Sequence, residues 1–347
     1  MKITTPRRCG AVLLAGALAV AACGSGAADD AAEDVAEDVS EVVTTTAEAD
    51  ETTTVPDDEE ETTTTEAEIA VEAYPVELEA PNGVVTVAAM PQRIVSLSPS
   101  TTEMLFAIGA GGQVEAVDSF STYPADAPVT DLSAFEPNFE AIAAFEPDLV
   151  ITSFDLENSL TDAFAAIDVP VLVQSSALTI DDTYAQIADL GVITGNIDEA
   201  AAVNADVRTR VQAAIAGSMA NASGDPVRVY HELDDTFFSI SSASFIGDIY
   251  AKLGFENVAD EADPDGFGYP QVTPEYLIAA DPTLIVITDQ VGYTVDDVAA
   301  RPGWDSMTAV QSGNVVQIDA DIASRWGPRV ADLAERLAEL SAPATTG

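Results

Sequence analysis

Lysine is almost absent from this sequence. Lys2 and Lys252 are its only lysines, and the 347 residues hold 12 lysines and arginines against 60 aspartates and glutamates. The formal net charge at pH 7 is −48. Negative charge in such excess repels the phosphates of nucleic acid and the headgroups of anionic lipids. We therefore exclude nucleic acid as a partner.

Long hydrophobic runs are also lacking, apart from residues 9–22. This run is shorter than the roughly 20 residues of a membrane-spanning helix, and a positive start (Lys2, Arg7 and Arg8) precedes it, as in a signal peptide. It ends in "VAAC", which resembles a bacterial lipobox, whose cysteine receives a diacylglyceryl group. We therefore expect residues 1–22 to be a lipoprotein signal peptide. The mature protein would be exported and held by a lipid on Cys23 to the outer face of the cytoplasmic membrane. A chance cysteine and twin-arginine export stay open alternatives.

Cysteine and histidine are scarce as well. Cys9 should leave with the signal peptide and Cys23 should carry lipid, so no pair remains for a disulfide, and the domain must rely on a sizeable core. His231 is the only histidine, and the sequence contains no G-x-S-x-G motif. Without a cysteine nucleophile or a choice of histidine bases, we expect no enzyme.

The segment "HELDD", residues 231–235, raises the question of a metal site. His231 and Glu232 would alternate on a strand and point to opposite faces. A metal usually takes more nitrogen or sulfur ligands than one histidine supplies. We therefore expect no metal ligands here.

Residues 23–75 form a segment of a different character. From residue 24 onward it contains no lysine or arginine and is dominated by Asp, Glu, Thr and Ala. Low hydrophobicity with unbalanced charge cannot offset the entropy lost on ordering. We expect a disordered acidic stalk, with a functional acidic arm as the alternative; the sequence does not decide whether its threonines are glycosylated.

The rest of the chain predicts an α/β fold in two halves, residues 76–195 and 225–341, followed by a tail at 342–347. Short apolar runs of the type found in strands buried on both faces alternate with helical segments. The strands expected are 93–97, 114–118, 147–153, 169–176, 227–233, 282–289 and 314–319. The helices expected are 101–108, 139–144, 181–190, one ending near 253, and 328–340.

One long helix is expected between the halves, over residues 196–224. Its apolar residues recur at helical spacing (Ala201, Val207, Val211, Ile215), and Gly224 with Pro226 ends it. At 1.5 Å per residue it would be about 35–40 Å long, enough to bridge two lobes.

Four motifs occur in order over residues 90–341: "PQRIVSLSPSTTE", "NFEAIAAFEPDLVITS", "GYPQVTPEYLIAADPTLIVITD" and "RWGPRVADLAERL". Together they resemble the cobalamin and ferric-siderophore binding proteins of ABC importers. The resemblance implies two Rossmann-like lobes joined by a single long rigid helix, with the ligand cleft between the lobes. "SPSTTE" with the later "YP" favours the cobalamin-like branch.

The resemblance also implies a docking role for Glu140 in "NFEAI" and Glu275 in "TPEYL". In the family, one glutamate per lobe meets arginines of the membrane permease. Two separated carboxylates facing guanidinium groups would set the orientation of the complex. The alternative is that each is an ordinary first-turn glutamate favoured by the helix dipole.

The ligand cleft should be lined at the ends of the strands. The hydroxyl-rich loop after residue 97 places Ser100 there, and aromatic residues in loops would form walls for a large flat ligand. These aromatic residues are Phe120, Tyr123, Phe154, Phe245 and Tyr269. Plain packing is the alternative for each of them.

The loop "DIASRWGPR" is the other expected contributor. By the resemblance, Asp321 and Arg325 reach the ligand from the second lobe, accepting from and donating to its amide or carboxylate groups. Trp326 would cover the cleft or pack beneath it. The alternative is that Asp321 caps a helix and Arg325 satisfies nearby carbonyls.

The glycine-rich segment "GAGG", residues 109–112, follows a predicted helix and not a strand. It is therefore a helix stop and not a nucleotide-binding fingerprint.

The sequence therefore predicts a monomeric substrate-binding lipoprotein that captures a corrinoid such as cobalamin and delivers it to an ABC permease and its ATPase. A ferric siderophore or haem is the alternative ligand. A surface enzyme or a ligand sensor on the same fold is the alternative function.

Overall fold

A computed structural model describes residues 74–221 and 224–341. The predicted signal peptide, Cys23, nearly all of the predicted stalk and the tail at 342–347 lie outside the described residues. Within the described ranges, no helix has both the length and the apolar character needed to cross a membrane.

The first lobe is built on a five-stranded parallel sheet in the order β5-β4-β3-β6-β7. Its central strands are buried along their whole length, as the continuous apolar runs predict. The strands are β3 (Ile94–Leu97), β4 (Val114–Asp118), β5 (Val129–Leu132), β6 (Leu149–Thr152) and β7 (Val171–Val173). The helices are α2 (Pro99–Ala107), η1 (Ala110–Gln113), α3 (Phe139–Ala143), η2 (Leu156–Asn158), α4 (Ser159–Ala165) and α5 (Ile180–Thr194).

An antiparallel hairpin precedes this sheet, β1 (Val76–Ala80) and β2 (Gly83–Val87). This hairpin was not predicted from the sequence, although Asn82–Gly83 between two alternating segments is a strong hairpin signal. Asn82 ties the hairpin to the lobe, since its side-chain amide donates to the Val171 carbonyl at 2.8 Å.

The second lobe repeats the design with a four-stranded parallel sheet in the order β11-β10-β8-β9. Its strands are β8 (Arg228–His231), β9 (Glu256–Asn257), β10 (Leu284–Thr288) and β11 (Val315–Ile318). Its helices are α7 (Phe245–Lys252), η3 (Asp260–Ala262), α8 (Pro274–Ala280), α9 (Val295–Ala299), η4 (Trp304–Ser306), α10 (Thr308–Gln311), α11 (Ala320–Ser324) and α12 (Val330–Glu339). The predicted α/β fold with two lobes is therefore confirmed.

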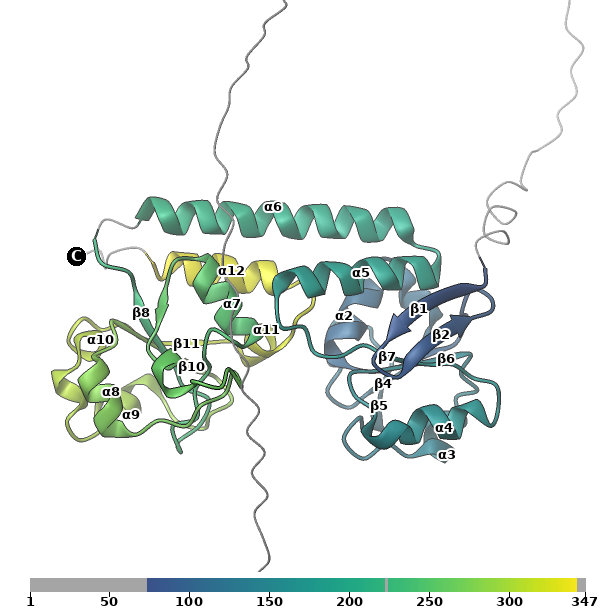
Figure 1. The fold of residues 1–347 in the computed structure, drawn as a ribbon, viewed down its shortest axis with the longest axis horizontal. Helices are drawn as coiled ribbons and strands as arrows, with labels where there is room; N and C mark the ends of the chain where they lie inside the picture. Colours follow the sequence, from purple (N-terminus) through teal and green to yellow (C-terminus); the bar gives the residue numbers. More distant parts are fainter. Residues whose placement is uncertain (1–73, 222–223, 342–347) are drawn as a thin grey trace, which may run out of the picture. The chain divides into compact units, whose positions relative to one another are not determined.

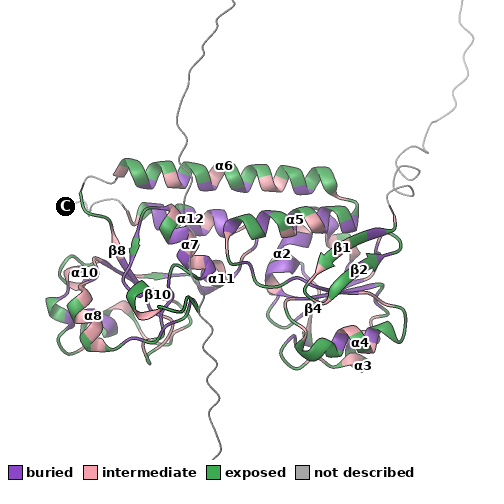
Figure 2. Ribbon diagram, in the orientation of Figure 1, coloured by how far each residue is buried: buried purple, intermediate pink, exposed green. Residues whose placement is uncertain are grey.

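The long helix expected between the lobes is α6 (Ile197–Asn221), 25 residues and about 37 Å long at the usual rise. Figure 1 shows α6 running above α5 of the first lobe and α12 of the second. Most of its surface is exposed, and its buried residues recur along one side, at Ala200, Val207, Val211, Ala214 and Ser218 (Figure 2). Polar contacts add to this packing, because Asn204 donates to Tyr184 of α5 at 2.9 Å and Arg210 pairs with Glu335 of α12. The helix thus binds both lobes.

Each lobe has a hydrophobic cluster on either face of its sheet, and one cluster of the second lobe also includes Ala177, Ile180 and Tyr184 of the first. Trp326, just after α11, packs against one cluster of each lobe, and so does Val203 of α6. The segment around Trp326 therefore joins the second lobe to the first at a point away from α6 in the sequence.

Candidate functional site

A cavity of about 440 Å³ lies at the carboxyl ends of the first lobe's strands, where open α/β sheets usually bind ligands. The segment around α11 of the second lobe closes its other side. The lining residues are Leu97, Pro99, Ser100, Asp118, Phe120, Ala134, Phe135, Ser153, Phe154, Ser176, Gln290, Asp321, Ser324, Arg325 and Trp326.

A larger cavity of about 700 Å³ lies among α2, α6 and α12. It is walled mainly by helices, and most of its lining residues come from α2, α6 and residues 328–332 rather than from the ends of strands. We therefore place the candidate site in the smaller cavity, which we call the cleft.

The hydroxyl-rich loop before α2 contributes to the cleft mainly through Ser100. Ser98 caps α2, its Oγ accepting from the Thr101 amide at 3.3 Å. Thr101 and Thr102 are fully buried, and Thr102 Oγ1 lies 2.9 Å from Ser96 Oγ and 3.1 Å from Ser121 Oγ. Most of these hydroxyls therefore stabilise the turn from β3 into α2, with Ser100 left at the cleft.

Three phenylalanines form an aromatic wall on the first-lobe side. Phe120, Phe135 and Phe154 follow β4, β5 and β6 and are 55%, 71% and 39% exposed. The rings of Phe120 and Phe135 meet edge to face at 6.1 Å, and those of Phe135 and Phe154 lie 5.5 Å apart. Large apolar side chains that are so exposed suit the face of a bound apolar ligand.

A carboxyl group lies beneath this wall. Asp118, at the end of β4, is 1% exposed and accepts from the Ser121 hydroxyl at 2.6 Å. Its burial raises the pKa of the carboxyl, an effect that the hydrogen bonds from the Ser121 side chain and backbone oppose.

Arg325 lines the cleft, and its guanidinium is bonded within the protein. Its guanidinium is almost fully buried and donates to Glu103 Oε1 of α2 at 3.1 Å and to the Phe120 carbonyl at 2.9 Å. It also pairs with Asp321 at 2.9 Å. Arg325 satisfies a backbone carbonyl, as in the alternative, while Asp319 and not Asp321 caps α11. Contact of Arg325 and Asp321 with a ligand stays a prediction.

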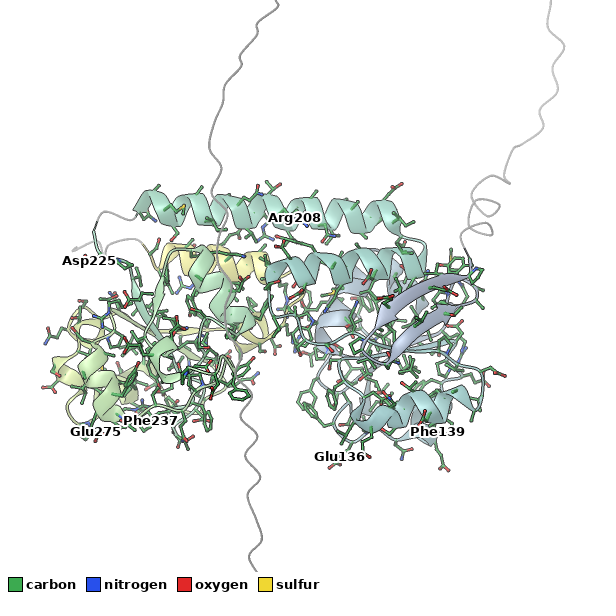
Figure 3. The ribbon with its side chains drawn as sticks, in the orientation of Figure 1. Glu136, Phe139, Arg208, Asp225, Phe237 and Glu275 are labelled. Atoms are coloured by element: carbon green, nitrogen blue, oxygen red, sulfur yellow. The ribbon has the colours of Figure 1, made fainter. Side chains whose placement is uncertain are left out.

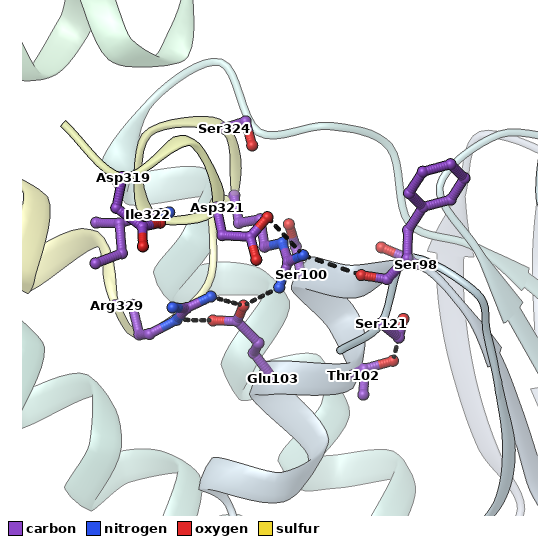
Figure 4. Close-up of polar contacts among 12 residues, drawn as sticks. Ser98, Ser100, Thr102, Glu103, Ser121, Asp319, Asp321, Ile322, Ser324 and Arg329 are labelled. Carbon is purple, nitrogen blue, oxygen red and sulfur yellow. Dashed lines mark hydrogen bonds and ion pairs between the residues drawn. The ribbon is translucent and has the colours of Figure 1, made fainter. Parts of the chain in front are cut away.

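Glu103 joins the lobes through two arginines. Its carboxylate is buried in α2 of the first lobe, and Arg329 of the second lobe donates to it at 2.6 and 2.9 Å, in addition to Arg325 (Figure 4). The hydrogen bond to Glu103 raises the pKa of Arg329. The Trp326 amide also donates to Ser100 Oγ at 3.2 Å. The floor of the cleft is thus held by bonds between the two lobes.

Three predicted aromatic contacts are not part of the cleft. Phe245 is not in a loop, as predicted, but begins α7 and is packed in the second lobe's core at 6% exposure. Tyr123 lines the larger cavity, where the Arg329 guanidinium lies 4.1 Å from its ring centre. Tyr269 is 57% exposed and is not among the residues that line the cleft.

Several residues at the site were missed from the sequence, among them the cleft residues Asp118, Ser153, Gln290 and Ser324, and also Phe135 and Glu103. Phe135 follows a strand as Phe120 and Phe154 do, so the same rule of aromatic residues at strand ends would have found it once β5 was predicted. Glu103 lies in the quoted motif "SPSTTE", but its partners are more than 220 residues away in the chain. Sequence spacing gives no signal for such a pair.

The "HELDD" segment has a structural role. His231 is fully buried, with Nδ1 3.1 Å from the Tyr250 hydroxyl, and burial lowers the pKa of its ring to about 4. Glu232 is also buried and pairs with Arg301 at 2.6 Å. Within residues 74–221 and 224–341, no group of three or more His, Cys, Asp or Glu side chains could hold a metal ion.

Glu140 and Glu275 occupy equivalent places in the two lobes. Each is an exposed residue in the first turn of a helix that precedes a buried strand, α3 before β6 and α8 before β10. Figure 3 places Glu275, and Phe139 beside Glu140, on the side of each lobe away from α6. Their role in docking stays a prediction.

The sequence pattern of the periplasmic binding protein family matches residues 94–322. This range covers most of both lobes and the helix between them. The chain belongs to the periplasmic binding protein family. The resemblance to substrate-binding proteins of ABC importers is therefore confirmed, and the family identifies a binding protein and not an enzyme.

Individual relatives agree with this family. A "Cobalamin-binding protein" of Halobacterium salinarum (strain ATCC 29341 / DSM 671 / R1) is 30% identical over 275 residues, 77% of this chain and 74% of the relative. An "Uncharacterized ABC transporter substrate-binding lipoprotein YvrC" of Bacillus subtilis (strain 168) is 27% identical, over 79% of this chain and 88% of its own length.

Among solved structures, the periplasmic heme-binding protein HutB of Vibrio cholerae matches with a TM-score of 0.64 and 23% identity. The match covers 73% of this chain and 99% of that protein. At this identity, the likeness supports the fold of this periplasmic binding protein and not its ligand.

Proposed function

We propose that this periplasmic binding protein captures a corrinoid of the cobalamin type in its cleft and delivers it to an ABC permease. The observation that carries the proposal is the wall of Phe120, Phe135 and Phe154 facing the polar groups of Asp321 and Ser324 across the cleft. Aromatic walls with a few polar anchors suit a large flat ring with a polar edge.

The ligand assignment draws on two supports of different kinds. The cobalamin-binding relative is 30% identical across both lobes. The neutral polar side chains of the cleft, among them Ser100, Ser153 and Gln290, match the amide groups around a corrin ring. A ferric siderophore or haem is the second candidate, because an aromatic wall also suits those ligands.

Titration of the purified mature protein with candidate ligands tests the ligand assignment. Cobalamin should quench or shift the fluorescence of Trp326, which lines the cleft, and saturate at one molecule per chain. Haem and a panel of ferric siderophores serve as comparison. Saturable binding of a siderophore or haem without binding of cobalamin would contradict the corrinoid assignment.

The proposed place of action is the outer face of the cytoplasmic membrane, through a lipid on Cys23. Replacing Cys23 with alanine should move the protein from the membrane fraction to the soluble fraction, because stable anchoring requires the lipid. Fractionation of cells after a high-salt wash measures this. A Cys23→Ala protein that stays with washed membranes would show that the anchor lies elsewhere.

A further inference from the structure

Few charged residues line the cleft, and acidic side chains outnumber basic ones. Among the described residues that line it, Arg325 is the only cation, and Asp118 and Asp321 are acids. The other polar lining groups are the hydroxyls of serines and the amide of Gln290. The cleft is therefore rich in neutral donors and acceptors and poor in positive charge.

The one cation of the cleft is already neutralised. Arg325 Nη1 donates to Glu103, and Nη2 contacts both Asp321 and the Phe120 carbonyl. Glu103 cannot turn away to water, because its side chain is 1% exposed and its second oxygen is held by Arg329 at 2.9 Å. Arg329 in turn faces the larger cavity, with its guanidinium over the Tyr123 ring.

We propose that Glu103 and Asp321 are specificity-determining residues that keep anionic ligands out of the cleft. Both carboxylates pair with Arg325, so no unpaired cation remains there, and the cleft accepts a ligand with a neutral periphery, such as the amides of a corrinoid. Chelates with ionised carboxylates or catecholates, haem among them, are rejected. This inference rests on the proposed function, because it concerns the ligand of the same cleft.

The physical reason is the cost of removing an anion from water. A carboxylate entering the cleft loses hydration and needs a cationic partner in return. Here it would meet Asp321 at the rim and a guanidinium already shared with Glu103. A primary amide needs only hydroxyl and amide partners, which the cleft provides.

Cobalamin and its monocarboxylates, in which one peripheral amide is hydrolysed to a carboxylic acid, form a matched set of probes. They share the corrin ring and differ by one charge at pH 7. The wild-type protein should bind cobalamin about tenfold or more tightly than the monocarboxylates, and should bind haem weakly. Isothermal titration calorimetry measures the affinities.

Two variants each remove one of the two carboxylates that pair with Arg325. Glu103→Gln removes the buried partner while keeping the side-chain shape, and Asp321→Asn removes the partner at the rim. In both variants, the ratio of the affinity for cobalamin to the affinity for the monocarboxylates should fall. Both variants should also bind haem more tightly than the wild type does. Should thermal melting show that Glu103→Gln does not fold, Asp321→Asn carries the test.

Glu335→Gln is the control. It also removes one of two carboxylates from an arginine and changes the net charge equally. Here the arginine is Arg210, which pairs with Glu335 and Asp332 between α6 and α12, and neither Glu335 nor Arg210 lines the cleft. Its ligand preference should equal that of the wild type. A matching change in Glu335→Gln would mean that net charge alone sets the preference, which would overturn the role of Glu103.

The outcomes separate this inference from the proposed function. If the wild type binds cobalamin but binds the monocarboxylates or haem equally well, the inference is wrong and the function stands. An unchanged preference in the folded Glu103→Gln and Asp321→Asn variants also overturns it. If no corrinoid and no haem binds, both proposals are wrong.

Discussion

Replacing Glu140 and Glu275 together with alanine should nearly abolish uptake of the ligand while its affinity for the binding protein stays unchanged. Both side chains are exposed, they lie on separate lobes, and neither lines the cleft. If each carboxylate meets an arginine of the permease, the double variant loses two charge pairs at once. That loss should weaken the complex roughly 100-fold. Uptake by proteoliposomes containing the permease and its ATPase measures the effect.

The structure offers a matched control for this experiment. Asp198 and Glu199 are also exposed acids in the first turn of a helix, but they belong to α6. The Asp198→Ala and Glu199→Ala double variant loses the same charge and similar helix-dipole interactions. It should transport normally. Charge reversal of Glu140 and Glu275 to arginine should be worse than alanine, since repulsion is added. Normal transport by the Glu140→Ala and Glu275→Ala double variant would leave these residues as ordinary helix glutamates.

The two lobes could be predicted from sequence because most strands of their parallel sheets have a local apolar pattern; the edge strands β5 and β9 were missed. The runs that became β3, β6 and β10 are apolar along their length, which is the pattern of a strand covered on both faces. Helix α2 has its own start and stop signals, Ser98 with Pro99 at one end and Gly109, at φ +82°, at the other. The long helix α6 is equally evident, because its apolar spacing continues without an internal proline.

The site was less predictable because it depends on contacts between distant segments. Position at a strand end is a local property, so Phe120, Phe154 and Ser100 could be named in advance. Whether Arg325 is free or paired depends on a glutamate in the other lobe, and the sequence contains no local signal of that partner. The prediction for Phe245 was wrong for a related reason. Because Phe245 follows a serine-rich loop, we expected it to be exposed, but it is the first residue of α7 and packs in the core.

Substitutions in the aromatic wall should also have a large effect, in this case on the affinity for the ligand. Replacing Phe120, Phe135 and Phe154 together with alanine should weaken binding of the wild-type ligand on the order of 100-fold or more, because each ring supplies both apolar area and stacking. The fold should survive, since all three side chains are already exposed without ligand. Thermal melting close to that of the wild type would establish this, and calorimetric titration would measure the affinity.

Leucine at the same three positions distinguishes the flat ring from apolar area. Leucine keeps much of the hydrophobic surface but cannot stack on a planar ligand, so affinity should fall in the order Phe, Leu, Ala. Ile197→Ala is the control, because Ile197 is a large apolar residue, 55% exposed at the start of α6, and does not line the cleft. It should bind as the wild type does. Wild-type affinity in the triple alanine variant would mean that the ligand lies elsewhere. The larger cavity among α2, α6 and α12 would then become the place to search, with Tyr123 and Arg329 as the first residues to replace.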